Sequence, residues 1–153
     1  GGASWNPGGM FQFEINDTAG IAGGGLDGLG WDLVTIDDGA GTGKLDLTGL
    51  SAADPFEIHV VSLDGAAPGA IANFNPTVPY DWVFVTYDEL VDDYFHPSLF
   101  VVNASGFSNG MGQGHYTVTQ MGGGLAVSFI PEPGTLIMAL SALALLLCRR
   151  RRK

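Results

Sequence analysis

The sequence predicts a mainly β domain followed by a single C-terminal transmembrane helix. Short runs of alternating apolar and polar residues recur along residues 1–130, and a period of two is typical of half-buried strands. Asp-Gly and Asn-Gly pairs lie between several runs, and both pairs favour tight turns. A continuous apolar run near the C-terminus then ends in five basic residues. These observations divide the chain at about residue 130.

The run Met10–Asn16 illustrates the strand pattern. Phe11, Phe13 and Ile15 share one face of the predicted strand, and polar side chains share the other. Seven further runs have similar patterns: Trp31–Ile36, Lys44–Leu47, Phe56–Leu63, Trp82–Tyr87, Leu99–Asn103, His115–Gln120 and Leu125–Ile130. Short strands at nearly regular spacing predict an all-β domain.

One short helix is predicted at about residues 88–95. Thr86 and Glu89 have the spacing of a capping box. An apolar stripe could follow, formed by Leu90, Val91, Tyr94 and Phe95. Pro97 would end the helix, because the residue before a proline is disfavoured in the helical region.

Two all-β architectures fit the strand pattern. A β-sandwich closes on itself, whereas a β-helix stacks successive rungs and needs neighbouring rungs to cover its ends. No clean internal repeat is visible along residues 1–130, so the pattern leaves both architectures open.

The C-terminal segment has the features of a membrane span. Residues 134–148 carry no charge, and Leu and Ala, both good helix formers, dominate them. At ~1.5 Å per residue this helix would be about 22 Å long, shorter than a bilayer core of about 30 Å. The basic residues that follow are Arg149, Arg150, Arg151, Arg152 and Lys153. They would stop translocation and keep this end cytoplasmic, which places residues 1–130 outside the inner membrane.

Pro131, Glu132 and Pro133 precede this run, and the order of motif, apolar segment and basic end resembles the PEP-CTERM sorting signal of bacteria. The resemblance covers residues 131–153. It implies recognition of the motif by an exosortase, a membrane transpeptidase, and subsequent transfer or release to the cell surface, the extracellular matrix or an exopolysaccharide. The hydrophobic tail would then be temporary, as in a GPI signal.

Scattered motifs in the body carry a second resemblance. Among them are Gly30–Leu33, Pro55–Ile58, Ala72–Pro76 and Leu99–Phe107. Together they look like the C-terminal region of proteins with autotransporter-associated β-strand repeats. This resemblance implies the terminal rungs of a right-handed β-helix, although the diagnostic glycine-rich repeat is not within these residues.

Charge is distributed very unevenly. The chain has 16 Asp and Glu, and Lys44 is the only Lys or Arg before the basic end. Such a surface repels nucleic acid, so we expect no nucleic-acid partner. Cys148 is the only cysteine, which excludes an intrachain disulfide. An outward-facing domain needs an export signal, and none precedes Gly1, so we expect the chain to be the C-terminal part of a longer exported protein.

Two glycine-rich segments have some features of ligand-binding loops. Residues 39–44 resemble a phosphate-binding loop but lack its first glycine, and Leu45 stands where Ser or Thr is required. Residues 23–28 resemble one calcium-binding β-roll repeat, and Asp27, Asp37 and Asp38 could supply oxygen ligands to Ca²⁺. Turns with special backbone geometry explain both segments better, and no metal or cofactor is predicted.

No catalytic residue is predicted either. His59, His96 and His115 lie in separate elements, Ser105 lacks the flanking glycines of a nucleophile elbow, and adjacent carboxylates at Asp92 and Asp93 point apart. A sugar-stacking platform could be formed by Trp5, Trp31, Tyr80, Trp82 and Tyr87, although a β core explains these aromatic residues equally well.

The sequence therefore predicts a non-enzymatic, exported bacterial surface or matrix protein. Its C-terminal signal would be processed by an exosortase. Two alternatives remain open at this point: an extracellular polysaccharide-active enzyme with catalytic rungs upstream, and a surface carbohydrate-binding module.

Overall fold

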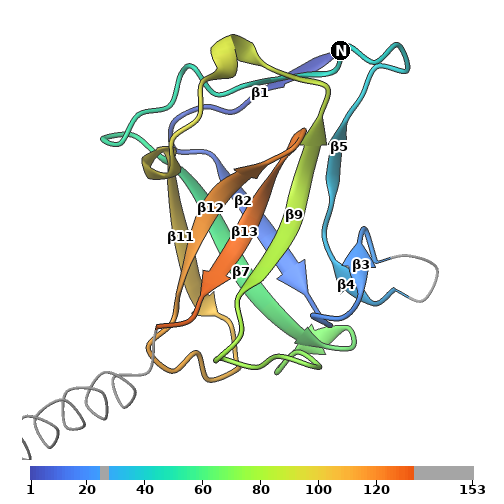
Figure 1. Cartoon of the computed structure of the whole chain (residues 1–153), viewed down its shortest axis with the longest axis vertical. Helices are drawn as coiled ribbons and strands as arrows, with labels where there is room; N and C mark the ends of the chain where they lie inside the picture. Colours follow the sequence, from blue (N-terminus) through green and yellow to red (C-terminus); the bar gives the residue numbers. More distant parts are fainter. Residues whose placement is uncertain (25–27, 133–153) are drawn as a thin grey trace, which may run out of the picture.

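A computed structural model describes residues 1–24 and 28–132 (Figure 1). In the described part the regular secondary structure consists of β-strands, apart from two short 3₁₀ turns. In chain order the elements are β1 (Gly2–Ser4), β2 (Met10–Ile15), β3 (Ile21–Ala22), β4 (Gly30–Trp31), β5 (Val34–Ile36), β6 (Lys44–Asp46), β7 (Phe56–Asp64), β8 (Ala67–Pro68), β9 (Tyr80–Tyr87), β10 (Glu89–Leu90), η1 (Val91–Asp93), η2 (Pro97–Leu99), β11 (Phe100–Gly106), β12 (His115–Met121) and β13 (Gly124–Ile130).

The chain passes through three sheets in the same order three times, and each such passage is called a circuit here. The first circuit contains β1, β2 and β5, and the second contains β6, β7 and β9. Each strand of the second circuit pairs in parallel with its counterpart in the first. The third circuit adds β10 to β6 and β11 to β7, again in parallel. Residues about 45 positions apart are therefore brought side by side, as Phe13 and Val60 are.

In the third sheet, the strands of the third circuit pair antiparallel rather than parallel. There β12 and β13 form an antiparallel hairpin, and β13 runs antiparallel to β9. The turn between β12 and β13 contains Gly123, whose φ of 80° is in the left-handed region that favours glycine. Figure 1 shows β12, β13 and β9 side by side on this face. As the central strand of the group, β13 is buried from Gly124 to Phe129.

Aromatic and aliphatic side chains from all three sheets fill the interior. In β7 the inward positions begin at Phe56 and continue through Ile58 and Val60, while the residues between them are more exposed. The strand alternation predicted for this segment is confirmed. The largest fully buried side chains include Phe13, Trp82, Phe84 and Phe129.

The predicted mainly β class agrees with the structure, but other parts of the fold prediction need correction. The predicted helix at 88–95 is wrong, because this segment contains β10 and the three-residue turn η1. Asp92 and Asp93 have φ values of 58° and 50°, which an α-helix cannot contain. A plain stack of β-helix rungs would also not contain the antiparallel hairpin β12–β13. Three sheets, rather than the two of a sandwich, form the described domain.

The membrane prediction also requires correction. The transmembrane helix predicted at 134–148 lies outside the described residues. Within residues 1–24 and 28–132, no helix has the length and apolar character needed to cross a membrane. The assignment as a single-pass inner-membrane protein depended on that helix, and it is withdrawn together with the orientation derived from it.

Candidate functional site

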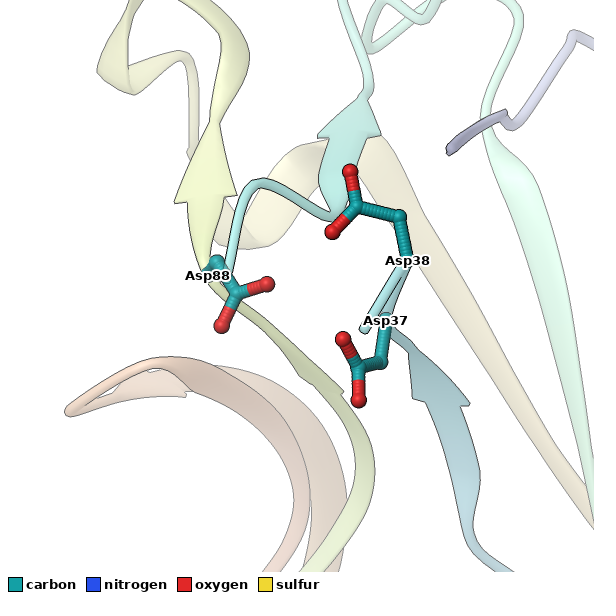
Figure 2. Close-up of side chains that lie close together, drawn as sticks. All are labelled: Asp37, Asp38 and Asp88. Atoms are coloured by element: carbon teal, nitrogen blue, oxygen red, sulfur yellow. The ribbon is translucent and has the colours of Figure 1, made fainter. Parts of the chain in front are cut away.

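Three aspartates meet at one edge of the domain. Asp37 and Asp38 follow β5, and Asp88 follows β9. Because β5 and β9 pair in parallel, their carboxyl ends lie next to each other. One carboxylate oxygen from each aspartate lies within 4.8 Å of the others. Figure 2 shows the Asp88 carboxylate turned toward the loop that carries Asp37 and Asp38.

Each of these carboxylates already accepts hydrogen bonds within the chain. Asp37 accepts from the backbone N–H of Gly39 at 2.7 Å. Asp88 accepts from the backbone N–H of Gly43, also at 2.7 Å. Asp38 accepts from the hydroxyl of Thr42 and from two backbone N–H groups. The Thr42 hydroxyl is the largest of several causes that lower the pKa of Asp38 well below its usual value.

These hydrogen bonds give the three carboxylates a structural role, because each one holds the backbone of a turn or loop. Carboxylate oxygens suit Ca²⁺, but Ca²⁺ takes 6–8 oxygen ligands and the three aspartates are all exposed. Of the suggested calcium ligands Asp27, Asp37 and Asp38, the first lies outside the described residues. Sequence reasoning missed Asp88, whose position depends on the parallel pairing of β9. The available signal was that two predicted strands, 31–36 and 82–87, are each followed directly by Asp.

A cavity of about 370 Å³ lies elsewhere, beside β2 and β4. Glu14 and Asp32 line it together with Trp31 and the glycine-rich backbone on either side of residues 25–27. The Glu14 N–H donates to Asp32 Oδ2 at 2.9 Å, and the Asp32 N–H donates to the Glu14 carbonyl at 3.0 Å. Burial raises the pKa of Asp32, the bond from the Glu14 N–H lowers it, and the charge of Glu14 raises it further.

The wall of this cavity is held by Asn16. Its side-chain Nδ2 donates to the Gly28 carbonyl, and its Oδ1 accepts from the Gly30 N–H, both at 2.8 Å. Trp31 is held as well, since its Nε1 donates to the Val83 carbonyl at 2.9 Å. Two of the residues that line the cavity, Asn16 and Trp31, are therefore held by hydrogen bonds to the backbone.

The other aromatic residues do not form a surface platform for sugars. Trp82 is buried and stacks on Tyr80, with ring centroids 5.2 Å apart. Trp5 is half-buried and stacks on Phe56 at 4.6 Å. Tyr87 is also buried. Of the five aromatic residues considered for sugar contact, Trp31 lines the cavity described above.

The histidines and the serine are not brought together. His59 contacts Glu57 at 2.7 Å, and His96 caps η2 by accepting from the Ser98 N–H. His115 begins β12 and is exposed. Ser105 lies on β11, where its N–H donates to the Asn103 side chain.

The predicted sorting motif begins directly after the last strand. β13 ends at Ile130, Pro131 is half-buried and Glu132 is exposed. Pro133 and the basic residues 149–153 lie outside the described residues.

Comparison with protein-family models, with curated proteins and with solved structures found no match.

Proposed function

We propose that the chain is an exported, non-enzymatic protein whose residues from Pro131 onward form a PEP-CTERM-type sorting signal. An exosortase would recognise Pro131, Glu132 and Pro133. The observation that carries this proposal is the position of the motif: the core domain ends at Ile130, and Glu132 is already exposed two residues later.

This position suits a processing site. Ile130 makes the last pair of the hairpin, opposite His115. Pro131 has no backbone N–H and cannot donate to continue the ladder. A transpeptidase could therefore reach the motif without opening the sheet, because the backbone of residues 131 and 132 is not part of a strand.

A non-enzymatic role for the domain is supported by how its acidic residues are used. Asp37, Asp38 and Asp88 hold turns through bonds to backbone N–H groups. Asp46 does the same with Thr48. The net charge of −10 argues against nucleic acid as a partner. A matrix exopolysaccharide is part of the proposal only because the resemblance of the C-terminal signal implies it.

The proposal can be tested by substituting Glu132→Ala and, separately, Pro131→Ala in the native host. The intact mass and C-terminal peptides of the accumulated protein report whether cleavage has occurred. We expect both variants to accumulate unprocessed. Asp54→Ala, in an exposed turn between β6 and β7, is the matched control and should be processed normally. Normal processing of the Glu132→Ala and Pro131→Ala variants would refute the proposed signal.

A further inference from the structure

Three tripeptides in the sequence have the spacing Asn-x-Ser/Thr, which is the acceptor pattern for attachment of a sugar to an asparagine side chain. They begin at Asn16, Asn75 and Asn103. Pro76 stands at the middle position of the second tripeptide, and proline at that position prevents use of the pattern. The sequence does not distinguish the other two tripeptides, but their surroundings in the structure differ.

The tripeptide at Asn16 is tied into the fold. The Asn16 Nδ2 donates to the Gly28 carbonyl and its Oδ1 accepts from the Gly30 N–H, both at 2.8 Å. The third residue, Thr18, donates its N–H to the Ala72 carbonyl at 3.2 Å. The nitrogen that would receive a sugar is therefore already engaged, and the Asn16 side chain is only partly exposed.

The tripeptide at Asn103 lies on an edge strand instead. β11 is the last strand in the order of its sheet and pairs on one side with β7. Asn103 and Ser105 are both exposed. The pairing is irregular here, since β11 advances from Asn103 to Gly106 while β7 advances only from His59 to Val61. One extra residue of β11 is accommodated, as in a β-bulge, which moves this part of the strand out of the regular ladder.

The groups that the acceptor pattern supplies are also unengaged at this position. Asn103 Oδ1 accepts from the Ser105 N–H at 3.0 Å, a bond of the Asx-turn type that orients the side-chain amide. Within residues 1–24 and 28–132, no hydrogen bond uses the Asn103 Nδ2 or the Ser105 hydroxyl. The amide nitrogen and the hydroxyl two residues later are therefore both available to an enzyme that approaches from solvent.

We propose that Asn103 is a site of N-glycosylation, with an oligosaccharide carried on a membrane lipid through a diphosphate as the donor. The Asn103 Nδ2 forms a bond to C1 of the first sugar, and the bond from C1 to the diphosphate oxygen breaks. The diphosphate leaves with the electron pair, and a base of the transferase accepts one proton from the amide. The inference rests on the proposed export, because this pattern is used in exported proteins.

A sugar at Asn103 has a physical consequence for the domain. The outer edge of β11 presents backbone N–H and C=O groups that can pair with a strand of another chain. A bulky, hydrated group on the exposed side of that strand hinders such pairing. Glycosylation at this position would therefore keep the edge of the sheet from associating with other chains.

The test is mass spectrometry of the protein purified from the native host. Chymotryptic peptides report sugar on each asparagine, and the intact C-terminal peptide reports processing in the same sample. We expect sugar on Asn103 and none on Asn16, which is the control within the chain. Asn103→Gln and Ser105→Ala should each abolish the modification, whereas Ser105→Thr should retain it, because threonine keeps the hydroxyl that the pattern requires. Circular dichroism of each variant shows whether it remains folded.

The two readouts separate this inference from the sorting signal. Processed protein without sugar on Asn103 would overturn the glycosylation site and leave the sorting signal standing. Unprocessed protein with sugar on Asn103 would do the reverse. Equal modification of Asn16 and Asn103, or unchanged modification in the Ser105→Ala variant, would also overturn the proposed site.

Discussion

The indole Nε1 of Trp31 donates a hydrogen bond to the backbone carbonyl of Val83 at 2.9 Å. Trp31 belongs to β4 and Val83 to β9, which lie in different sheets. This bond therefore links the two larger sheets beside the cavity. The Trp31 side chain is half-buried. Its apolar ring packs against other side chains while its N–H group has a hydrogen-bond partner, as is usual for a buried tryptophan.

Replacing Trp31 by Phe should destabilise the domain by about 1–2 kcal/mol, because the Val83 carbonyl loses a part-buried donor and some packing is lost. Urea unfolding followed by circular dichroism measures the change. Val101→Ala, an exposed apolar position on β11, is the control and should change stability by less than about 0.5 kcal/mol. A loss no greater than that of the control would mean that the bond between the sheets is not a stabilising contact.

Gly30→Ala should be strongly destabilising, by roughly 2–4 kcal/mol. Gly30 has a φ of 138°, and a Cβ atom there would overlap the backbone of Ile21 on the paired strand β3. Gly28→Ala is the matched control. Its φ of 65° is also unfavourable, but open space surrounds it, so we expect only about 1 kcal/mol. Thermal unfolding compares the two variants, and similar losses would contradict the proposed backbone overlap.

Tyr116→Phe should leave stability unchanged or increase it slightly. The Tyr116 hydroxyl is buried without a hydrogen-bond partner in the described part of the chain, and burial raises the pKa of this phenol. Removing a buried polar group that has no partner removes its desolvation cost. Tyr80→Phe is the contrasting variant, since the Tyr80 hydroxyl accepts from the Asn75 N–H, and it should lose stability. A loss of more than about 1 kcal/mol in Tyr116→Phe would show that its hydroxyl has a partner.

Asp32→Asn should stabilise the domain more at pH 7 than at pH 3. The pKa of Asp32 is raised above 3.8, chiefly by burial, so folding favours its protonated form. That contribution is present below pH 3.8 and is lost as the pH rises through the folded-state pKa. Urea midpoints at the two pH values, compared with Asp54→Asn as control, measure the difference. An equal gain at both pH values would contradict a raised pKa.

The alternation of side chains was sufficient to predict most long strands. In β7 every second residue from Phe56 is buried, as expected for a strand with one face on a core. The predicted strand 31–36 was only partly correct, because Trp31 ends β4 while Val34 begins β5 in another sheet. Periodicity cannot reveal such a break, since the pattern on each side is the same.

Sequence signals from neighbouring residues gave a wrong prediction where pairing with a distant strand determines the backbone conformation. Thr86 and Glu89 predicted a helix start, but Glu89 and Leu90 instead pair in parallel with Lys44 and Leu45. The aspartate cluster could not be predicted for the same reason, since Asp88 reaches Asp37 and Asp38 only through the pairing of β9 with β5.

By itself, the sequence determined the mainly β class, the alternation of buried and exposed residues along the strands, and the acidic character of the domain, because these depend on the order and chemistry of neighbouring residues. Only the tertiary structure decided the order in which the strands pair. It also decided that one cavity is lined by Glu14, Trp31 and Asp32. Parallel strands are joined by long connections, and the contacts between them depend on how the chain returns to the same face.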